Sequence, residues 1–331
     1  MPPASFHVDA CLFDMDGTLT DSINAVEAAW ARVAEEIGRD PAEIIALTHG
    51  RRAIDNLAEL KNVCEEEMDE AVEKFEHSIL YYADAFHKWR RRMPSSAVST
   101  PALDTSSGSS APSSGPPSRQ PSSTGHSDPI RPGFVSRLSD MLIATARELE
   151  EKGLVEGEAC LQVNEGNSTP FEELQEWQLE AAAVDRSVKI LPGVRRMLAS
   201  IPAGRYAVAT SGAQTYAYGC MTRVGITPPS VTITADDPRL QAGKPSPDPF
   251  LLAAACLGFE AKNCVVFEDS PSGIRAGVAS GATVIAVCTS HERSQIENYG
   301  AHYVVEDMER VTCQVVGQGE NMKLKFTILE N

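Results

Sequence analysis

Several features that mark particular classes of protein are missing from this chain of 331 residues. No segment approaches the roughly 20 consecutive apolar residues that a membrane-spanning helix needs, so we expect no membrane partner. No lysine or arginine precedes Arg32, and the short N-terminal apolar run is interrupted by Asp9, which argues against a secretory signal. None of the eight cysteines forms a C-x-x-C pair, and several lie in apolar runs. We therefore expect reduced thiols in a cytoplasmic protein rather than a disulfide framework.

Basic residues are also scarce, because 29 lysines and arginines stand against 46 acids, giving a net charge of −17 at pH 7. This balance argues against broad nucleic-acid binding, which requires a basic face. It also constrains the binding of any anionic ligand, because the overall negative field repels it. An anionic substrate would therefore need a locally positive pocket, built from a metal ion or a few specific cations.

The stretch from residue 24 to residue 186 is predicted to be mainly helical. Apolar residues recur at three- to four-residue spacing over 65–92, and shorter helices are expected over 24–37 and 51–60. A similar pattern runs from Val135 to Leu149. Between the longer patterns, residues 93–130 consist mostly of Ser, Pro, Thr and Gly. So few apolar side chains cannot offset the entropy of ordering, so we expect this tract to be disordered.

The remaining sequence alternates short apolar runs with helical segments, a pattern typical of α/β proteins with a doubly wound parallel sheet. The expected strands are 8–13, 206–210, 231–234, 264–267, 283–287 and 303–305, and a terminal hairpin is expected from 312–316 and 323–329. One strand precedes the helical stretch and the others follow it. The sequence thus predicts a core of residues 1–23 and 187–331, with a helical domain of residues 24–186 inserted after the first strand.

Two acids follow the first predicted strand, in the string from Phe13 to Asp21. Parallel strands place reactive groups at their carboxyl ends, and Gly17 permits the bend that turns Asp14 and Asp16 toward one ligand. One carboxylate can attack phosphorus, while the other protonates the leaving oxygen and later deprotonates water. Acids this close repel one another unless a cation lies between them, which implies Mg²⁺. The alternative is a solvated acidic turn that caps a helix.

Two further segments offer groups that bind phosphate. Thr210 and Ser211 end an apolar strand, where the hydroxyl and the following N–H groups can hold phosphate oxygens. An ordinary strand-to-helix turn has the same residues. Lys244, between a glycine and a proline, can supply the positive charge that stabilises a transition state. A lone lysine before proline is also typical of a surface loop.

A third pair of polar groups, Glu268 and Asp269, ends the apolar run 264–267. Burying two adjacent carboxylates is costly unless a cation is bound, so both are candidate metal ligands together with Asp14 and Asp16. The alternative is an acidic helix start stabilised by the helix dipole.

Together, in this order, these segments resemble the haloacid-dehalogenase superfamily of phosphohydrolases. The resemblance implies a Rossmann-like core, a Mg²⁺ ion and a mobile helical cap. It implies that Asp14 is the nucleophile and a metal ligand, and that Asp16 is the general acid and base and offers its backbone carbonyl to the metal. Thr210 and Lys244 would bind phosphate, and Asp269 would bind Mg²⁺ with Glu268 beside it.

A closer resemblance is to fungal-type 2-deoxyglucose-6-phosphate and glycerol-phosphate phosphatases. The residues that carry it are Cys11–Trp30, His49-Gly50-Arg51-Arg52, Tyr206–Gly212, Thr232–Phe250 and Val265–Ala276. In that subgroup a His-Gly-x-Arg pattern lies in the cap, which makes His49 and Arg52 candidates for substrate contacts. Residues 81–180 are extra relative to the subgroup and fall within the cap.

The sequence therefore predicts a Mg²⁺-dependent phosphohydrolase of small sugar or polyol phosphates that forms an aspartyl-phosphate, and a monomer with no nucleic-acid partner. One alternative is a sugar phosphomutase on the same scaffold. Another is a non-catalytic sensor or scaffold that uses the Ser/Pro-rich tract for partners. Dehalogenase chemistry is disfavoured because displacing a halide needs no acid at Asp16.

Overall fold

The computed structural model describes residues 4–92 and 176–329. The chain divides into two compact units, Met1–Phe86 with Val184–Asn331, and His87–Ala183. Only the end of one long helix and the helix α6 (Glu176–Ala183) are described in the second unit. The predicted disordered tract at 93–130 and the predicted helical pattern at 135–149 both lie outside the described residues. The account below concerns the first unit.

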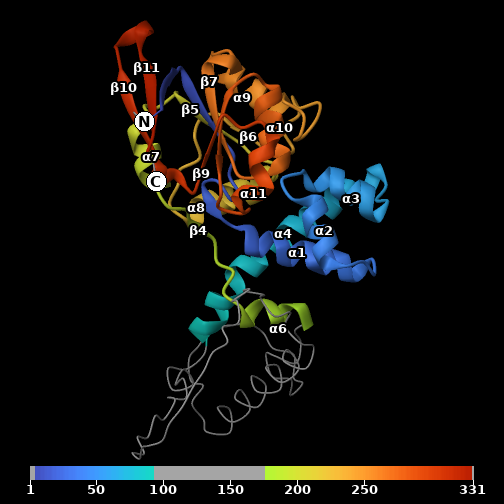
Figure 1. Cartoon of the computed structure of the whole chain (residues 1–331). Coiled ribbons are helices and arrows are strands. Elements are labelled where there is room, and N and C mark those ends of the chain that lie inside the picture. Colours follow the sequence, from blue (N-terminus) through green and yellow to red (C-terminus); the bar gives the residue numbers. More distant parts are fainter. Residues whose placement is uncertain (1–3, 93–175, 330–331) are drawn as a thin grey trace, which may run out of the picture. The chain divides into compact units, whose positions relative to one another are not determined.

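A six-stranded parallel sheet forms the centre of this unit (Figure 1). Its order is β6 (Thr232–Ile233), β5 (Tyr206–Ala209), β2 (Ala10–Phe13), β7 (Cys264–Glu268), β8 (Thr283–Val287) and β9 (Tyr303–Val305). All five neighbouring pairs are parallel. The predicted α/β class with a parallel sheet is confirmed, and β2, the first strand of this sheet, lies near its middle.

Both faces of the sheet are covered, which explains why its strands are apolar without alternation. On one face, α9 (Asp248–Leu257) and α10 (Pro271–Ala279) pack against side chains such as Leu12 and Val266. On the other face, the rings of Phe13 and Phe267 stack with their centroids 5.0 Å apart, and Phe326 packs against Phe267 at 5.8 Å.

Phe326 belongs to a second sheet of three antiparallel strands, β1 (Ser5–Val8), β11 (Lys323–Ile328) and β10 (Val311–Val316). The predicted terminal hairpin is confirmed as β10 and β11. The prediction of a single strand over 8–13 is wrong, because the chain changes sheet at Asp9. There the Asp9 N–H donates to the Asn263 carbonyl and its carboxylate accepts from Lys323 at 2.7 Å. These contacts take Asp9 out of both ladders.

Four helices follow the first strands: α1 (Ile23–Glu36), α2 (Pro41–Thr48), α3 (Ala53–Lys61) and α4 (Glu65–Arg92). The chain enters them through β3 (Thr20–Asp21), which pairs with β4 (Lys189–Ile190) on the return. The sequence predicted α1, α3 and α4 but missed α2. Its signals were present, because Asp40 accepts a hydrogen bond from the Ala42 N–H and Pro41 occupies the first helical position.

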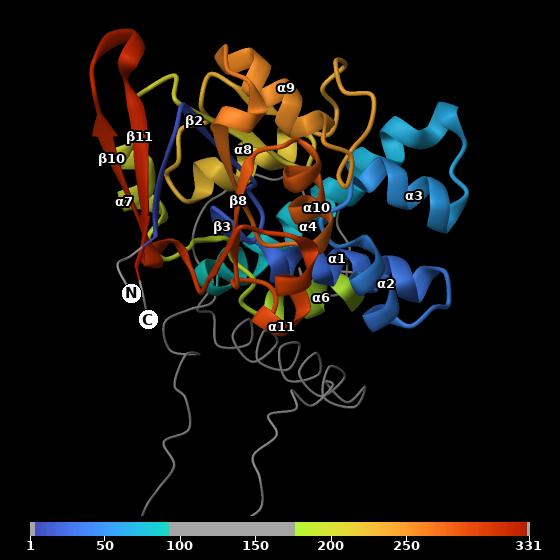
Figure 2. The same cartoon turned by 45° about the horizontal axis from the view of Figure 1, so that its top comes forward.

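The remaining helices of this unit, which follow β4, are α7 (Val194–Ser200), α8 (Gln214–Arg223) and α11 (Arg293–Ile296). Both views place α1, α2 and α3 on the side of α10, away from the β10–β11 hairpin (Figures 1 and 2). Within residues 4–92 and 176–329, no helix has the length and apolar character needed to cross a bilayer. The described cysteines are all free thiols.

Candidate active site

The loop after β2 is folded tightly around one carbonyl. The Met15 oxygen accepts hydrogen bonds from the N–H groups of Leu19 and Thr20, at 2.8 and 3.0 Å. The Asp14 N–H donates to the Phe267 carbonyl on the neighbouring strand β7, which fixes the point where Asp14 leaves the sheet. As a result Asp14 and Asp16 line the same pocket at the carboxyl end of the sheet.

Lys244, in the loop before α9, is almost completely buried and contacts Asp14 at this pocket. Its ammonium donates to Asp14 Oδ1 at 2.5 Å and to Glu268 Oε1 at 2.7 Å. Burial alone would lower the pKa of Lys244, but the charges of Asp14 and Glu268 outweigh it and raise this pKa. The alternative of a solvated surface lysine is therefore wrong, and Lys244 is a buried cation that touches Asp14.

Glu268 is held rigidly beneath the start of α10. Its Oε2 accepts from the N–H groups of Asp269 and Ser270, both at 2.9 Å, and from the Ser270 hydroxyl at 3.0 Å. Gly273 leaves room for this carboxylate, because a Cβ there would lie 1.5 Å from Oε1. With Lys244 on Oε1, four hydrogen bonds hold this carboxylate, three of them through Oε2. This arrangement favours Glu268 as the residue that positions Lys244 over its predicted role as a direct metal ligand.

Asp269 has the properties of a metal ligand. It is 1% exposed, and its Oδ2 has no hydrogen-bond partner among the described residues. Ligand atoms of Asp14, Glu268 and Asp269 all lie within 4.8 Å of one another. Burial raises the pKa of Asp14, Lys244 opposes this rise, and repulsion from the neighbouring acids adds to it. A divalent cation fits here, because it would satisfy the unpartnered oxygen and offset the surplus of negative charge.

Thr210 and Ser211 follow β5 on the other side of β2. Thr210 is buried, and its hydroxyl oxygen accepts from the Gly212 N–H at 3.1 Å. Ser211 lines the pocket, but its hydroxyl donates to the Gly50 carbonyl at 3.0 Å. The phosphate-binding residues predicted from sequence therefore lie beside the acids, and Ser211 also ties the sheet to the helical insertion.

The turn between α2 and α3 brings His49 and Gly50 into the site. His49 Nε2 lies 3.7 Å from Asp269 Oδ2, and its ring contacts that of His291 at 4.5 Å between centroids. Burial lowers the pKa of His49, but the nearby negative charge of Asp269 raises it overall. Gly50 has a φ of +71°, and a Cβ there would lie 2.4 Å from Ser270 Oγ, so the close approach of this turn requires glycine.

The two arginines after this turn occupy different places. Arg52, the predicted substrate contact, donates two hydrogen bonds of 2.8 Å to Asp55 in the first turn of α3. Of the described residues, Arg51 lines the pocket and Arg52 does not. Arg51 is itself paired with Glu59 at 3.0 Å. Arg52 is the N-cap residue of α3, and its side chain is paired with Asp55 rather than directed into the pocket.

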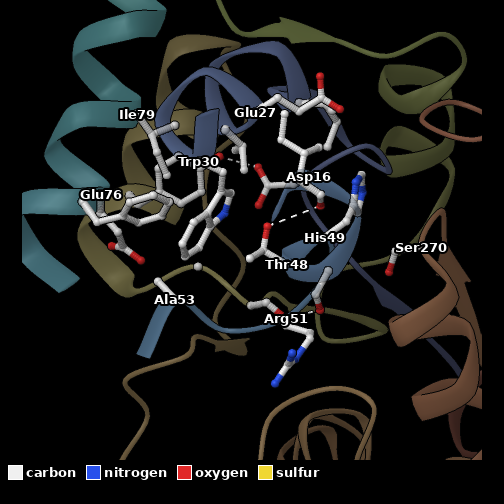
Figure 3. Close-up of a pocket in the computed structure, with 18 of the residues that line it drawn as sticks. Asp16, Glu27, Trp30, Thr48, His49, Arg51, Ala53, Glu76, Ile79 and Ser270 are labelled. Carbon is white, nitrogen blue, oxygen red and sulfur yellow. Dashed lines mark hydrogen bonds between the residues drawn. The ribbon is translucent and has the colours of Figure 1, made fainter. Parts of the chain in front are cut away.

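The pocket residues that come from the helices α1 to α4 are mostly apolar, and they include two acids. Trp30 packs against Phe75 with ring centroids 4.1 Å apart, and the acids are Glu27 and Glu76. Figure 3 shows Trp30 and Ile79 on the side of Glu76, with Asp16 and His49 lying toward Ser270. Sequence analysis missed these lining residues, because apolar side chains at helical spacing look the same whether they face a core or a ligand.

Asp16 is anchored by two hydroxyls that sequence analysis also missed. Tyr216 in α8 donates to Asp16 Oδ1 at 2.6 Å, and the Ser22 hydroxyl donates to the same oxygen. Burial raises the pKa of Asp16, and these two hydrogen bonds partly offset the rise. No motif marks Tyr216, which lies six residues beyond Thr210 on a helix face.

Glu76 gives a testable pH dependence. This residue is 5% exposed, its Oε1 accepts from the Ala213 N–H at 2.7 Å, and burial raises its pKa from 4.5 to about 7. A carboxyl whose folded pKa is raised contributes stability at low pH, which is lost as the pH rises through about 7. Glu76→Gln should therefore stabilise the protein relative to wild type by about 2–3 kcal/mol more at about pH 8 than at about pH 5.

Urea unfolding of both proteins at the two pH values measures this difference. Glu73→Gln, which changes an exposed glutamate of the same helix, is the matched control and should show no such pH dependence. An equal effect of Glu76→Gln at both pH values would contradict the prediction.

The buried acids and Lys244 at the carboxyl end of the sheet agree with the family to which the chain is matched, which is a family of hydrolases. The family model described as haloacid dehalogenase-like hydrolase matches residues 8–281, and the chain therefore belongs to this family. The predicted resemblance and the prediction of an enzyme are both confirmed, which disfavours the non-catalytic scaffold. A hydrolase structure from Pseudomonas syringae has the same fold, with a TM-score of 0.50 and 18% identity over 90% of this chain and 93% of its own.

Two relatives match nearly the whole chain. Hexitol phosphatase A of Escherichia coli is 25% identical over 93% of this chain and 95% of its own length. 2-Deoxyglucose-6-phosphate phosphatase 1 of Saccharomyces cerevisiae is 25% identical over 96% of this chain and 94% of its own.

Proposed function

We propose that this chain is a Mg²⁺-dependent phosphatase that transfers a phosphoryl group from a small sugar or polyol phosphate to Asp14 and then to water. The observation that carries the proposal is the close approach of Asp14, Lys244 and Asp269. One buried cation touches the nucleophilic carboxylate at 2.5 Å, and an unpartnered carboxylate oxygen lies beside them. Names of the two full-length relatives, both phosphatases, support the same activity.

Two proton transfers at Asp16 complete the reaction. In the first step a carboxylate oxygen of Asp14 attacks phosphorus, the bond to the ester oxygen breaks, and Asp16 donates its proton to that oxygen. In the second step Asp16 takes a proton from water, the water oxygen attacks the phosphorus of the aspartyl-phosphate, and the Asp14 carboxylate leaves. Inorganic phosphate and the original protonation state result.

The remaining groups neutralise phosphoryl charge, the main requirement of phosphoryl transfer. Lys244 offers its ammonium, and Thr210 its hydroxyl, with the N–H groups that follow it. Mg²⁺, held by Asp14, Asp269 and the Asp16 carbonyl, would supply Lewis-acid stabilisation of the phosphoryl oxygens. Glu268 keeps Lys244 in place through the 2.7 Å contact.

The pocket favours a substrate whose second end is uncharged. On the insertion side, Glu27 and Glu76 line the pocket together with Trp30, and Arg51, the one arginine among the described lining residues, is already paired with Glu59. Carboxylates bind hydroxyl groups and repel a second phosphate, and an aromatic ring packs against the C–H face of a sugar or polyol. This supports a monophosphate of a polyol or sugar.

Residues 24–186, inserted after the first strand, are proposed to act as the cap. The turn at His49 and Gly50 contacts Asp269 and Ser211, so this turn lies beside the acids. A cap that closes over the substrate excludes water from the first step.

The direct test is phosphate release from a panel of hexitol, hexose, 2-deoxyhexose and glycerol monophosphates, with Mg²⁺ or with excess EDTA. We expect turnover of at least one monophosphate that stops when EDTA removes the metal. Failure to release phosphate from any member of the panel would exclude the proposed activity.

A phosphomutase on the same scaffold is the alternative, because it would use the same aspartyl-phosphate. It would require a hexose bisphosphate as activator and would return the phosphoryl group to a sugar. Inorganic phosphate released in proportion to substrate, without a bisphosphate, excludes it. An isomeric sugar phosphate formed without free phosphate would instead exclude the phosphatase.

Gly17→Ala should impair the site more than its backbone strain explains. Gly17 has a φ of +76°, and a Cβ there would lie 2.1 Å from Asp269 Oδ2 and from Ser290 Oγ. Displacing Asp269 to relieve this overlap should lower kcat/KM by about 100-fold. The control is Gly258→Ala, since Gly258 has a similar φ of +84° but nothing within 4 Å of its Cβ among the described residues.

Both substitutions should cost about 1–2 kcal/mol of stability through the positive φ. Steady-state kinetics and thermal unfolding separate the two effects. Equal kcat/KM values for the two variants would contradict the role of Gly17 in making room for Asp269.

A further inference from the structure

Asp16 can transfer protons productively only if its carboxyl group is held in one orientation. The hydrogen bonds that it accepts from Ser22 and Tyr216 both end on the same oxygen, Oδ1. Within the described part of the chain, no hydrogen bond reaches Oδ2. An oxygen that accepts two O–H donors cannot readily carry a proton as well, because its lone pairs are used. The proton of the acid form is therefore confined to Oδ2, in the pocket that Asp16 lines.

Tyr216 is built into this arrangement. It is 2% exposed, and its ring lies over Gly212, where a Cβ would be 2.5 Å from Tyr216 Cδ1. The glycine after Thr210 and Ser211 thus makes room for the tyrosine. A buried phenol needs an acceptor for its O–H, and Asp16 provides it.

We propose that Tyr216 is a positioning residue for proton transfer, which holds Asp16 through Oδ1 so that Oδ2 faces the leaving oxygen of the substrate. The inference rests on the proposed phosphatase function. Tyr216 lies in α8 and Ser22 is the N-cap residue of α1, so the two hydroxyls that hold the carboxylate come from different elements.

The leaving group offers a test that separates positioning from structure. An alkyl phosphate must receive a proton as its ester bond breaks, whereas 4-nitrophenolate leaves without one. The value of kcat/KM reports the steps up to transfer of the phosphoryl group to Asp14. Tyr216→Phe, which removes only the hydroxyl, should lower kcat/KM by about 10- to 100-fold for the best alkyl phosphate and by less than about 3-fold for 4-nitrophenyl phosphate.

Two comparisons sharpen the experiment. Tyr218→Phe is the matched control, because Tyr218 lies on the same helix, does not line the pocket, and makes no side-chain hydrogen bond to the described residues. It should behave as wild type with both substrates. Ser22→Ala with Tyr216→Phe removes both donors and should lower the alkyl phosphate value further than either change alone, with more than additive effect.

Each outcome decides the matter. A selective loss with the alkyl phosphate supports the proposal, and thermal unfolding shows whether the variant is folded. Equal losses with the two substrates, or wild-type values with both, overturn the positioning role and leave the phosphatase intact. If the wild-type protein hydrolyses neither substrate, the proposed function itself fails, and this inference falls with it.

Discussion

Asp14→Asn should abolish turnover, with kcat/KM lowered by at least about 10⁴-fold, as is usual for loss of a covalent nucleophile. An amide has no negative charge with which to attack phosphorus, although it matches the carboxylate in shape. The fold should survive, because burial already raises the pKa of Asp14 and a neutral group there avoids that cost. Phosphate release from the best substrate of the panel measures the effect.

The control for this variant is Asp9→Asn, because Asp9 directly precedes β2 whereas Asp14 directly follows it. Asp9 binds Lys323 at the surface, far from the acids in the topology. Its loss should cost little stability and leave kcat/KM near that of wild type. An Asp14→Asn protein that is folded and retains even a tenth of the wild-type rate would remove Asp14 as the nucleophile.

Lys244→Met should have the second largest effect. The substitution removes the cation that lies between Asp14 and Glu268, at 2.5 and 2.7 Å. Losing one electrostatic contact to the transferred group lowers kcat by about 10²–10³-fold. Stability should fall by about 3–5 kcal/mol, because two buried carboxylates lose their partner. Denaturant unfolding and kinetics, both in Mg²⁺, measure the two effects.

Lys262→Met is the matched control, since Lys262 is an exposed lysine whose pairing with Glu260 is at the surface. It should change neither quantity appreciably. If Lys244→Met kept wild-type activity and stability, the ammonium would have no part in either phosphate binding or the buried charge balance.

The sequence predicted the sheet side of the site well, for physical reasons. Asp14 and Asp269 each follow a buried apolar strand, and the carboxyl ends of these neighbouring parallel strands meet at one edge. A short apolar run followed by an acid is visible without knowing the fold. The roles assigned to these residues stay proposals.

The insertion side was predicted less well. Arg52 fits the family pattern, but Asp55 captures it, and the neighbouring Arg51 lines the pocket instead. Which of two adjacent arginines faces a pocket depends on how a helix begins and on its local partners. Tyr216 had no sequence signal, because its hydroxyl meets Asp16 only through the packing of α8 over Gly212.

The central claim is a covalent phosphoryl-enzyme on Asp14, and one measurement addresses it most directly. The wild-type protein is mixed with its best monophosphate substrate and Mg²⁺, quenched in acid during turnover, digested at low pH and mapped by mass spectrometry. The account predicts one phosphoryl group on the peptide that contains Asp14, absent without substrate and absent from Asp14→Asn. A protein that releases phosphate rapidly but carries the phosphoryl group on another residue would contradict it.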